Sequence, residues 1–138
     1  MSVFVDTWGW LVLEDRRDSA HAVVRRFYER LQGQRESVVT SDYVLDETIT
    51  RLFHRRPFLE AKRFTEAMLA SDEEGFLRIE RVDHRRFKEA WVLRLRYDDQ
   101  PGISFTDLTS FALMRELRVT NALTQDRHFR QAGFNLVP

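Results

Sequence analysis

Four carboxylates of this sequence could act together in one reaction: Asp6, Glu47, Asp107 and Asp126. Like charges that share a pocket repel one another, so such a group requires a divalent cation or shared protons. Carboxylate oxygens are hard ligands, and with no His or Cys expected beside them they favour Mg²⁺ or Mn²⁺. A cation held there would polarise a phosphate oxygen and lower the pKa of a bound water, which is the chemistry of in-line attack on phosphorus.

Each of these acids also has a simpler explanation when it is considered alone. An Asp in the first turn of a helix gains about 0.3–1 kcal/mol from the helix dipole, which would account for Asp107 or Asp126. Asp6 could end a strand, and Glu47 could pair with Arg51 one turn later for about 0.2–0.5 kcal/mol. The shared function is favoured by the expected placement of all four acids at one edge of a sheet.

The elements that must position the acids alternate along the chain. Short apolar and β-branched runs predict strands, and helically spaced apolar residues predict the helices between them. The predicted strands are 3–5, 37–40, 76–82, 119–124 and a last one at 134–137. The predicted helices are 8–31 with a break at 16–18, 42–57, 58–69, 83–95, 104–117 and a short turn at 126–131. Caps are expected at Ser41 or Asp42, at Asp83, and at Ser104 or Thr106.

Strands that alternate with helices imply parallel crossovers. We therefore expect an α/β fold in three layers, α/β/α, around a mainly parallel sheet of four to five strands, with residues 1–138 as a single domain. In such sheets, ligands bind outside the carboxyl ends of the strands. Asp6 and Asp126 follow predicted strands, while Glu47 and Asp107 lie near the start of predicted helices, so all four can reach that edge.

The composition narrows the class of protein. The absence of Cys excludes disulfides, thiolate metal sites and thiol nucleophiles. No run approaches the roughly 18 apolar residues of a membrane span, and residues 1–6 lack the features of a signal peptide, so a cytoplasmic protein is expected. The formal net charge is zero, which argues against a surface coated in positive charge for nucleic acid. Because 20 of the 22 cations are Arg, the chain suits RNA or an acidic partner, although a genome rich in G and C would explain the bias equally well.

The sequence resembles the PIN domain family, and within it the VapC-like toxins of bacterial toxin–antitoxin pairs. The matching segments run from one end of the chain to the other: Val5-Asp6-Thr7, Asp46-Glu47-Thr48, Ser104-Phe105-Thr106-Asp107 continued by residues 110–114, and Thr124-Gln125-Asp126-Arg127-His128-Phe129. One departure is Trp8-Gly9-Trp10, where a small polar residue after the Asp-Thr pair is more usual in the family. We therefore expect an altered local shape of the pocket at this point.

The resemblance implies a ligand set, an activity and partners. It implies that Asp6, Glu47, Asp107 and Asp126 bind Mg²⁺ or Mn²⁺, and that the hydroxyls of Thr7, Thr106 and Thr124 hold these carboxylates in place. The implied activity is endonucleolytic cleavage of single-stranded or loop RNA, leaving 5′-phosphate and 3′-hydroxyl ends. VapC-like proteins are usually homodimers and are inhibited by a small antitoxin whose tail enters the acidic pocket, often with an Arg. RNA, an antitoxin and a second copy of the chain are the expected partners, and the number of metal ions stays open.

Other interpretations of the same residues remain open. A non-catalytic PIN-like module that binds RNA or protein is the main alternative, although the intact acid set argues against it. A phosphotransfer enzyme with Asp6 as nucleophile fits less well. The haloacid-dehalogenase type needs a second Asp where Trp8 stands, and a receiver domain needs a late Lys, whereas the last Lys here is Lys88. Among the His residues, His128 is the one placed to contact substrate phosphate, because it lies two residues from Asp126.

Overall fold

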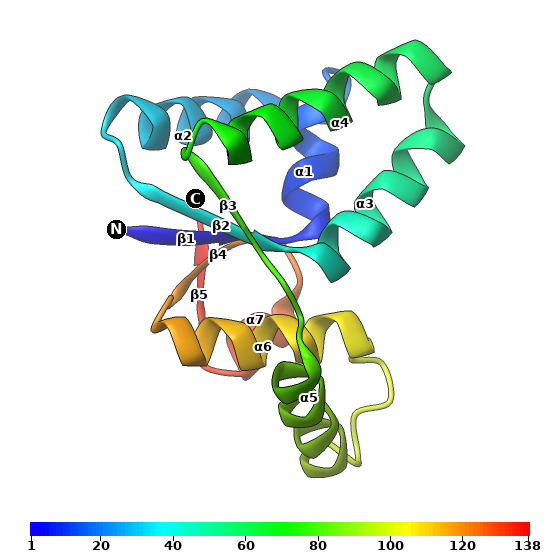
Figure 1. The fold of residues 1–138 in the computed structure, drawn as a ribbon, viewed down its shortest axis with the longest axis vertical. Helices are drawn as coiled ribbons and strands as arrows, with labels where there is room; N and C mark the ends of the chain where they lie inside the picture. Colours follow the sequence, from blue (N-terminus) through cyan, green and yellow to red (C-terminus); the bar gives the residue numbers. More distant parts are fainter.

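The computed structural model describes residues 1–138, which form a central sheet between two layers of helices (Figure 1). The strands are β1 (Ser2–Val5), β2 (Ser37–Ser41), β3 (Leu77–Glu80), β4 (Asn121–Leu123) and β5 (Asn135–Val137). All neighbouring strands pair in parallel, in the order β3-β2-β1-β4-β5. The expected three-layer α/β/α fold with a parallel sheet is therefore confirmed, and the sheet has five strands.

Seven helices cover the two faces of the sheet. One layer holds α1 (Thr7–Glu14), α2 (His21–Gly33), α3 (Asp42–Arg55) and α4 (Phe58–Glu73), and the other holds α5 (His84–Arg96), α6 (Phe105–Leu117) and α7 (Arg127–Gln131) (Figure 1). None of them combines the length and the hydropathy that a membrane span requires. The predicted break at 16–18 is confirmed, because α1 ends at Glu14 and α2 begins at His21.

The strand order reverses beside β1, and this reversal creates the edge at which the acids meet. From β1 the chain moves outward to β2 and β3 with α1–α4 on one face, then crosses to the other face and returns to place β4 on the free side of β1. In register, Phe4 lies between Val39 of β2 and Ala122 of β4. A crevice forms outside the carboxyl ends of two strands where the order reverses. Asp6 directly follows β1 at this point.

Hydrogen-bonded caps fix where the helices begin at this edge. Ser41 caps α3 by accepting a hydrogen bond from the backbone N–H of Val44 at 3.1 Å, and Asp83 caps α5 by accepting one from Arg86 at 2.9 Å. Ser104, rather than Thr106, caps α6. The ends of the strands are less regular than predicted. The fourth strand begins only at Asn121, because α6 ends with Arg118 in the left-handed conformation at φ 58°.

The Trp8-Gly9-Trp10 segment belongs to the packing of α1 against the sheet. A Cβ at Gly9 would lie 2.8 Å from the carbonyl oxygen of Leu123 and 2.9 Å from a methyl of Val5, so only glycine allows this approach. Trp10 is buried, and its indole N–H donates to the hydroxyl of Thr40 at 3.2 Å. That hydroxyl in turn donates to the carbonyl of Val5 at 2.8 Å. These contacts hold the beginning of α1, and with it Asp6, against the ends of β1, β2 and β4.

Candidate active site

Asp6 is the most buried carboxylate of the site. It stands between the end of β1 and the start of α1, and its Oδ2 accepts a hydrogen bond from the hydroxyl of Thr124 at 3.0 Å. Burial, together with the nearby charges of Asp107 and Glu47, raises the pKa of Asp6 from 3.8 to about 7. The ionised form of Asp6 is unfavourable at this buried position, so a bound cation would stabilise it strongly.

Asp107 is held by the cap of α6. The hydroxyl of Ser104 accepts a hydrogen bond from the backbone N–H of Asp107 at 3.0 Å, and Oδ2 of Asp107 accepts one from the backbone N–H of Ser104 at 3.3 Å. This reciprocal pair is a capping box, which fixes the carboxylate at the first turn of the helix. Burial raises the pKa of Asp107 to about 6, and the charges of Asp126 and Glu47 act in the same direction. Ser104 is thus a positioning residue for Asp107 as well as a helix cap.

Glu47 reaches the site from α3 and has two partners. Its Oε2 accepts a hydrogen bond from the hydroxyl of Thr7 at 3.1 Å, and its Oε1 pairs with Arg51 at 2.6 Å. The predicted pairing with Arg51 is therefore confirmed. Since the Arg51 side chain is 53% exposed, this ion pair contributes at most about 0.3–0.5 kcal/mol. The bond from Thr7 ties Glu47 to the residue next to Asp6.

Asp126 caps the single-turn helix α7 and brings His128 with it. Oδ1 of Asp126 accepts a hydrogen bond from the backbone N–H of His128 at 2.9 Å, and Nδ1 of the His128 ring lies 3.0 Å from the same oxygen. Donor atoms of Asp107, Asp126 and His128 all lie within 4.8 Å of one another. The expectation that no His would lie beside the acids is therefore wrong. The tight turn of α7 folds His128 back onto the cap residue.

The three threonines named from the resemblance behave differently. Thr124 donates to Asp6 and also accepts a hydrogen bond from the backbone N–H of Asp126 at 3.1 Å, so one hydroxyl links two of the acids. Thr7 donates to Glu47, as described above. The hydroxyl of Thr106 makes no hydrogen bond to any of the four acids, and its carbonyl accepts from Thr109 and Ser110 at 2.6 and 3.1 Å.

The donor set fits a divalent cation. The structure brings the four acids into one electrostatically coupled group, since Asp107 and Glu47 raise the pKa of Asp6, and Asp126 and Glu47 raise that of Asp107. Arg51 is the one basic side chain that pairs with any of the four, apart from His128 beside Asp126. Clustered carboxylate oxygens that basic side chains neutralise only in part are the ligands that Mg²⁺ and Mn²⁺ take in proteins.

Metal affinity is expected to increase as the pH rises through 6 to 7. Asp6 and Asp107, with pKa values of about 7 and about 6, hold protons below this range, and those protons must leave before a cation can bind. Titration calorimetry with MnCl₂ should show at least about a tenfold weaker affinity at pH 5.5 than at pH 7.5. Equal affinities at the two pH values would contradict the assignment of these two carboxylates as ligands.

The hydroxyl of Thr124 can be tested separately from the acids. Thr124→Val keeps the shape of the side chain but removes the donor to Asp6 and the acceptor for the backbone of Asp126. Loss of such a supporting hydrogen bond typically costs about 10–100-fold in metal affinity. Thr124→Ser retains the hydroxyl, so its metal affinity should stay within a few-fold of that of the unmodified protein. If both variants bind MnCl₂ alike, the hydroxyl has no role in holding Asp6.

A groove separate from the acids lies on the α1, α2 and α4 layer. Its volume is about 920 Å³. Its apolar lining includes Trp10, Leu13, Phe64 and Met68, and none of the four acids lines it. The acidic edge and this groove are therefore distinct features that α1 connects, because Asp6 precedes α1 and Leu13 lies near its end.

Comparison with known proteins identifies the family. The sequence model of the PIN domain matches residues 3–135. This chain belongs to the PIN domain family. Two proteins named 23S rRNA-specific endonuclease VapC20, from the Mycobacterium tuberculosis strains CDC 1551 / Oshkosh and ATCC 25618 / H37Rv, are each 35% identical to it over 132 residues. These alignments cover 96% of this chain and 95% of each relative, so the PIN domain of this chain matches almost the whole of VapC20.

Solved structures give the same result for the fold. The crystal structure of Mycobacterium tuberculosis VapC20, described as a sarcin-ricin loop cleaving toxin, superposes with a TM-score of 0.80 at 33% identity and covers 96% of this PIN domain and 95% of that chain. The structure of VapBC2 from Rickettsia felis, bound to a DNA fragment from its promoter, has a TM-score of 0.71 at 15% identity and covers 99% of this chain and 98% of that chain. The structure of FitAcB from Neisseria gonorrhoeae has a TM-score of 0.67 at 16% identity and covers 99% of this chain and 96% of that chain. The last two show the fold alone.

Proposed function

We propose that this PIN-domain protein is a metal-dependent endoribonuclease that hydrolyses RNA phosphodiester bonds, and that it is the toxin of a VapBC-like pair. The observation that carries this proposal is the gathering of four carboxylates where the strand order reverses, with the pKa of Asp6 raised to about 7 and that of Asp107 to about 6. Similarity to VapC20 over almost its whole length supports RNA as the substrate.

The residues of this chain would hold the cation and prepare the site. Asp6, Glu47, Asp107 and Asp126 supply its oxygen ligands, and the ion supplies Lewis-acid polarisation of the scissile phosphate and a water activated for attack. Thr124, Thr7 and Ser104 keep the carboxylates in fixed positions through the hydrogen bonds given above. Because the protein's own groups hold the carboxylates through these bonds, little reorganisation is needed when RNA arrives.

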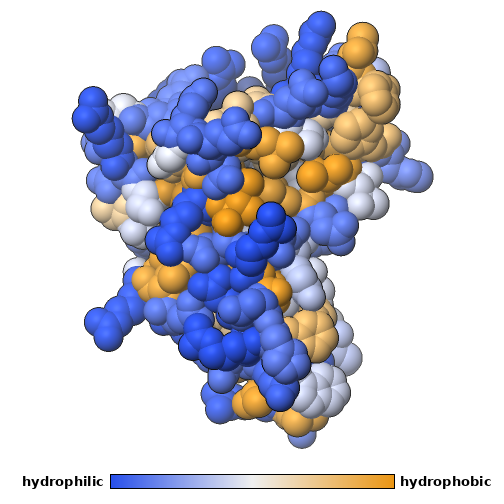
Figure 2. Space-filling model, viewed as in Figure 1, coloured by the Kyte–Doolittle hydropathy of each residue, from blue (hydrophilic) through white to orange (hydrophobic).

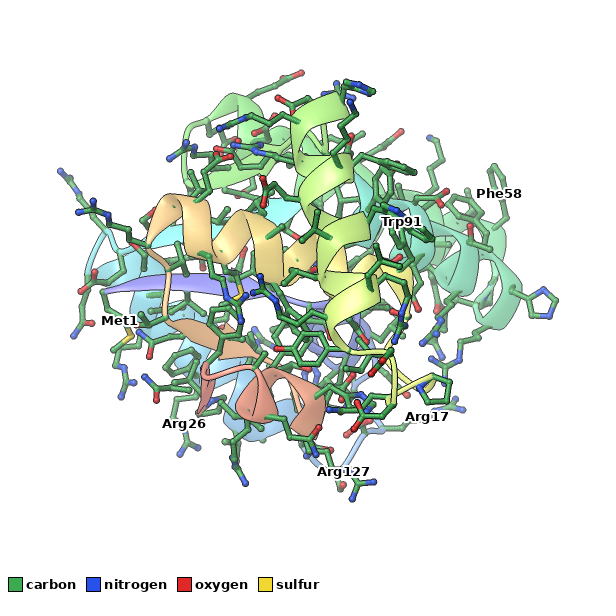
Figure 3. The ribbon with its side chains drawn as sticks, turned by 90° about the horizontal axis from the view of Figure 1, so that it is seen from below. Met1, Arg17, Arg26, Phe58, Trp91 and Arg127 are labelled. Carbon is green, nitrogen blue, oxygen red and sulfur yellow. The ribbon has the colours of Figure 1, made fainter.

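The proposed substrate is a loop of ribosomal RNA. VapC20 is named as specific for 23S rRNA and as cleaving the sarcin-ricin loop, and the two proteins match from end to end. A basic side chain borders the acidic edge in this protein, since Arg127 follows Asp126 and is exposed at the surface (Figure 3). Arginine pairs with phosphate through its planar fork, so Arg127 can contact the RNA backbone beside the site.

Incubation with purified ribosomes and with deproteinised 23S rRNA tests the activity and the substrate class. With Mg²⁺ or Mn²⁺ we expect a discrete pair of fragments, and EDTA or the Asp107→Asn substitution should remove it. Uniform degradation of the RNA would contradict a defined loop target. No cleavage of either substrate by folded, metal-loaded protein would favour the alternative, a non-catalytic PIN-like module that binds RNA or protein.

A small antitoxin is the proposed protein partner, and the groove of α1, α2 and α4 offers it a surface. Its floor is apolar, and at its rim Arg16, Arg17 and Arg63 form no salt bridge. A segment that carries apolar and acidic side chains would complement both features. Coexpression with an adjoining gene product, followed by copurification, tests this partner. Combining Arg17→Glu with Arg63→Glu should then weaken the complex.

A homodimer is the proposed assembly. Several large apolar side chains are exposed, including Phe58 and Leu59 at the start of α4 and Trp91 and Leu95 on α5. Apolar surface is visible at the corner where α3 meets α4 (Figure 2), and Phe58 begins α4 at this corner. An exposed apolar patch commonly marks an interface. Sedimentation of the protein and of Phe58→Ser would test it.

A further inference from the structure

His128 lies beside the acids but is not one of the four proposed metal ligands. Its side chain is 24% exposed and lies against Asp126, close to the Pro101-Gly102 turn, where a Cβ built on Gly102 would be 3.8 Å from Cε1 of the ring. Its donor atom lies within 4.8 Å of donor atoms of both Asp107 and Asp126. These three residues form the mixed cluster, one nitrogen donor beside two carboxylates.

The contact between His128 and Asp126 has the spacing of two ligands on one ion. Nδ1 lies 3.0 Å from Oδ1, and the same oxygen also accepts a hydrogen bond from the backbone N–H of His128. Ligand atoms at about 2.0–2.2 Å from a metal lie about 3 Å apart when they are adjacent and about 4.3 Å apart when they are opposite. The donor atoms of the mixed cluster therefore need little movement to converge on a cation.

Asp107 joins the mixed cluster to the other acids. Its charge acts on Asp6, and the charges of Asp126 and Glu47 act on it. The pocket thus divides into an all-oxygen group of Asp6, Glu47 and Asp107, and the mixed cluster of Asp107, Asp126 and His128, with Asp107 common to both. Only the mixed cluster offers a nitrogen.

We propose that His128 is a nitrogen ligand of the cation held by Asp107 and Asp126, and that it makes this part of the pocket prefer Mn²⁺ to Mg²⁺. The inference rests on the proposed function, since it concerns the same metal pocket. Imidazole binds first-row transition metals well, and affinity in that series rises from Mn²⁺ onward. Mg²⁺ instead keeps oxygen ligands and several waters. A nitrogen donor therefore strengthens the binding of Mn²⁺ more than that of Mg²⁺.

A role for His128 limited to positioning Asp126 makes a different prediction. In His128→Asn the side-chain amide can still reach Asp126, but an amide nitrogen has no lone pair to give a metal. The substitution therefore preserves a positioning contact and removes a nitrogen ligand. His128→Gln serves as a second variant with a longer reach, and His54→Asn, at an exposed residue near the end of α3, is the matched control.

Titration calorimetry with MnCl₂ and with MgCl₂, together with pulsed electron paramagnetic resonance of the Mn²⁺-loaded protein, tests the proposal. The unmodified protein and His54→Asn should prefer Mn²⁺ and show ¹⁴N coupling from a directly bound nitrogen. Loss of a supporting residue costs about 10–100-fold in metal affinity, so loss of a ligand should lower Mn²⁺ affinity at least about tenfold. Both His128 variants should lose the ¹⁴N coupling. Their affinity for Mg²⁺ should differ from that of the unmodified protein by less than about threefold.

Three outcomes would overturn the proposal. Retention of the ¹⁴N coupling in His128→Asn would show that His128 is not the nitrogen ligand. Equal losses of Mn²⁺ and Mg²⁺ affinity, without ¹⁴N coupling in the unmodified protein, would assign His128 a positioning role alone. Absence of Mn²⁺ binding by the unmodified protein would remove the metal pocket itself, and the proposed function would fail together with this inference.

Discussion

Asp6→Asn and Asp107→Asn are expected to abolish RNA cleavage and yet to stabilise the protein at pH 8 when divalent cations are absent. Each substitution removes a carboxylate proposed to hold the cation, while the Asn side chain keeps nearly the same size. It also removes one negative charge from a group in which the acids repel one another. Loss of function and gain of stability in the same variant is the signature of a site that is strained without its ligand.

The pH dependence of this effect follows from the sign of the pKa shift. Because the pKa of Asp6 is about 7 in the folded protein and 3.8 ordinarily, the folded state holds a proton that the unfolded state has released. The free energy of unfolding is therefore undiminished below about pH 4, falls as the pH rises from about 4 to about 7, and levels off above that. A pKa difference of this size corresponds to about 4 kcal/mol, which Asp6→Asn would recover at pH 8.

Thermal unfolding in EDTA, followed by circular dichroism, measures this gain. At pH 8 the Tm of Asp6→Asn should exceed that of the unmodified protein by about 10–15 °C. At pH 5 the gain should be less than half as large, because only part of the pH range over which the folded and unfolded states differ in bound protons lies below pH 5. Asp46→Asn is the matched control, because Asp46 is the exposed neighbour of Glu47 on α3. A lower Tm for Asp6→Asn at pH 8, or an equal gain for Asp46→Asn, would contradict the clustering of charge at Asp6.

Gly9→Ala is expected to lower both stability and activity, although Gly9 contacts no proposed substrate or ligand. Its new methyl would lie 2.8 Å from the carbonyl oxygen of Leu123, and that oxygen also accepts the backbone N–H of Asp6 at 3.3 Å. Overpacking against backbone costs about 1–3 kcal/mol. To relieve it, α1 must move away from β4, which separates Asp6 from Thr124. A displacement near 1 Å at a catalytic group can cost about 100-fold in rate.

Urea unfolding and the rate of RNA cleavage measure the two effects of Gly9→Ala. Gly33→Ala provides the comparison, because it ends α2, has an ordinary backbone conformation, and a Cβ there would meet nothing within 4 Å. That control should be neutral or stabilising by up to about 1 kcal/mol. If Gly9→Ala cleaves RNA at the rate of the unmodified protein, the approach of α1 to β4 does not position the site.

Much of the fold was predictable because the local signals agree with one another. The apolar run at residues 3–5 is buried on both faces of the sheet, as a central parallel strand should be. Ser41, Asp83 and Ser104 each cap the helix that their sequence pattern predicts. In parallel sheets, ligands bind outside the carboxyl ends of the strands. This rule predicted that the four acids lie at one edge, without knowledge of any contact.

The details of the site depended on tertiary contacts that no local pattern contains. His128 lies beside Asp126 because α7 is a single tight turn, and the sequence shows only that the two residues are close along the chain. The bond from Thr124 to Asp6 joins residues at opposite ends of the chain. For Asp107 a signal existed, since Ser-x-x-Asp is a capping-box pattern, and it identifies Ser104 rather than Thr106 as the partner. The Trp8-Gly9-Trp10 segment departs from the usual family pattern. The contact of Gly9 with the carbonyl oxygen of Leu123 explains the glycine, and the sequence alone does not contain that contact.

The most direct test of the central claim is to sequence the 5′-phosphate ends that the purified protein creates in total bacterial RNA. Reactions with Mn²⁺ or Mg²⁺ would be compared with EDTA, and Asp6→Asn with the exposed control Asp46→Asn. We predict a small number of new, metal-dependent ends in ribosomal RNA, present with Asp46→Asn and absent with Asp6→Asn. No new ends from folded, metal-loaded protein, or the same ends from Asp6→Asn, would contradict a ribonuclease whose chemistry depends on this acidic pocket.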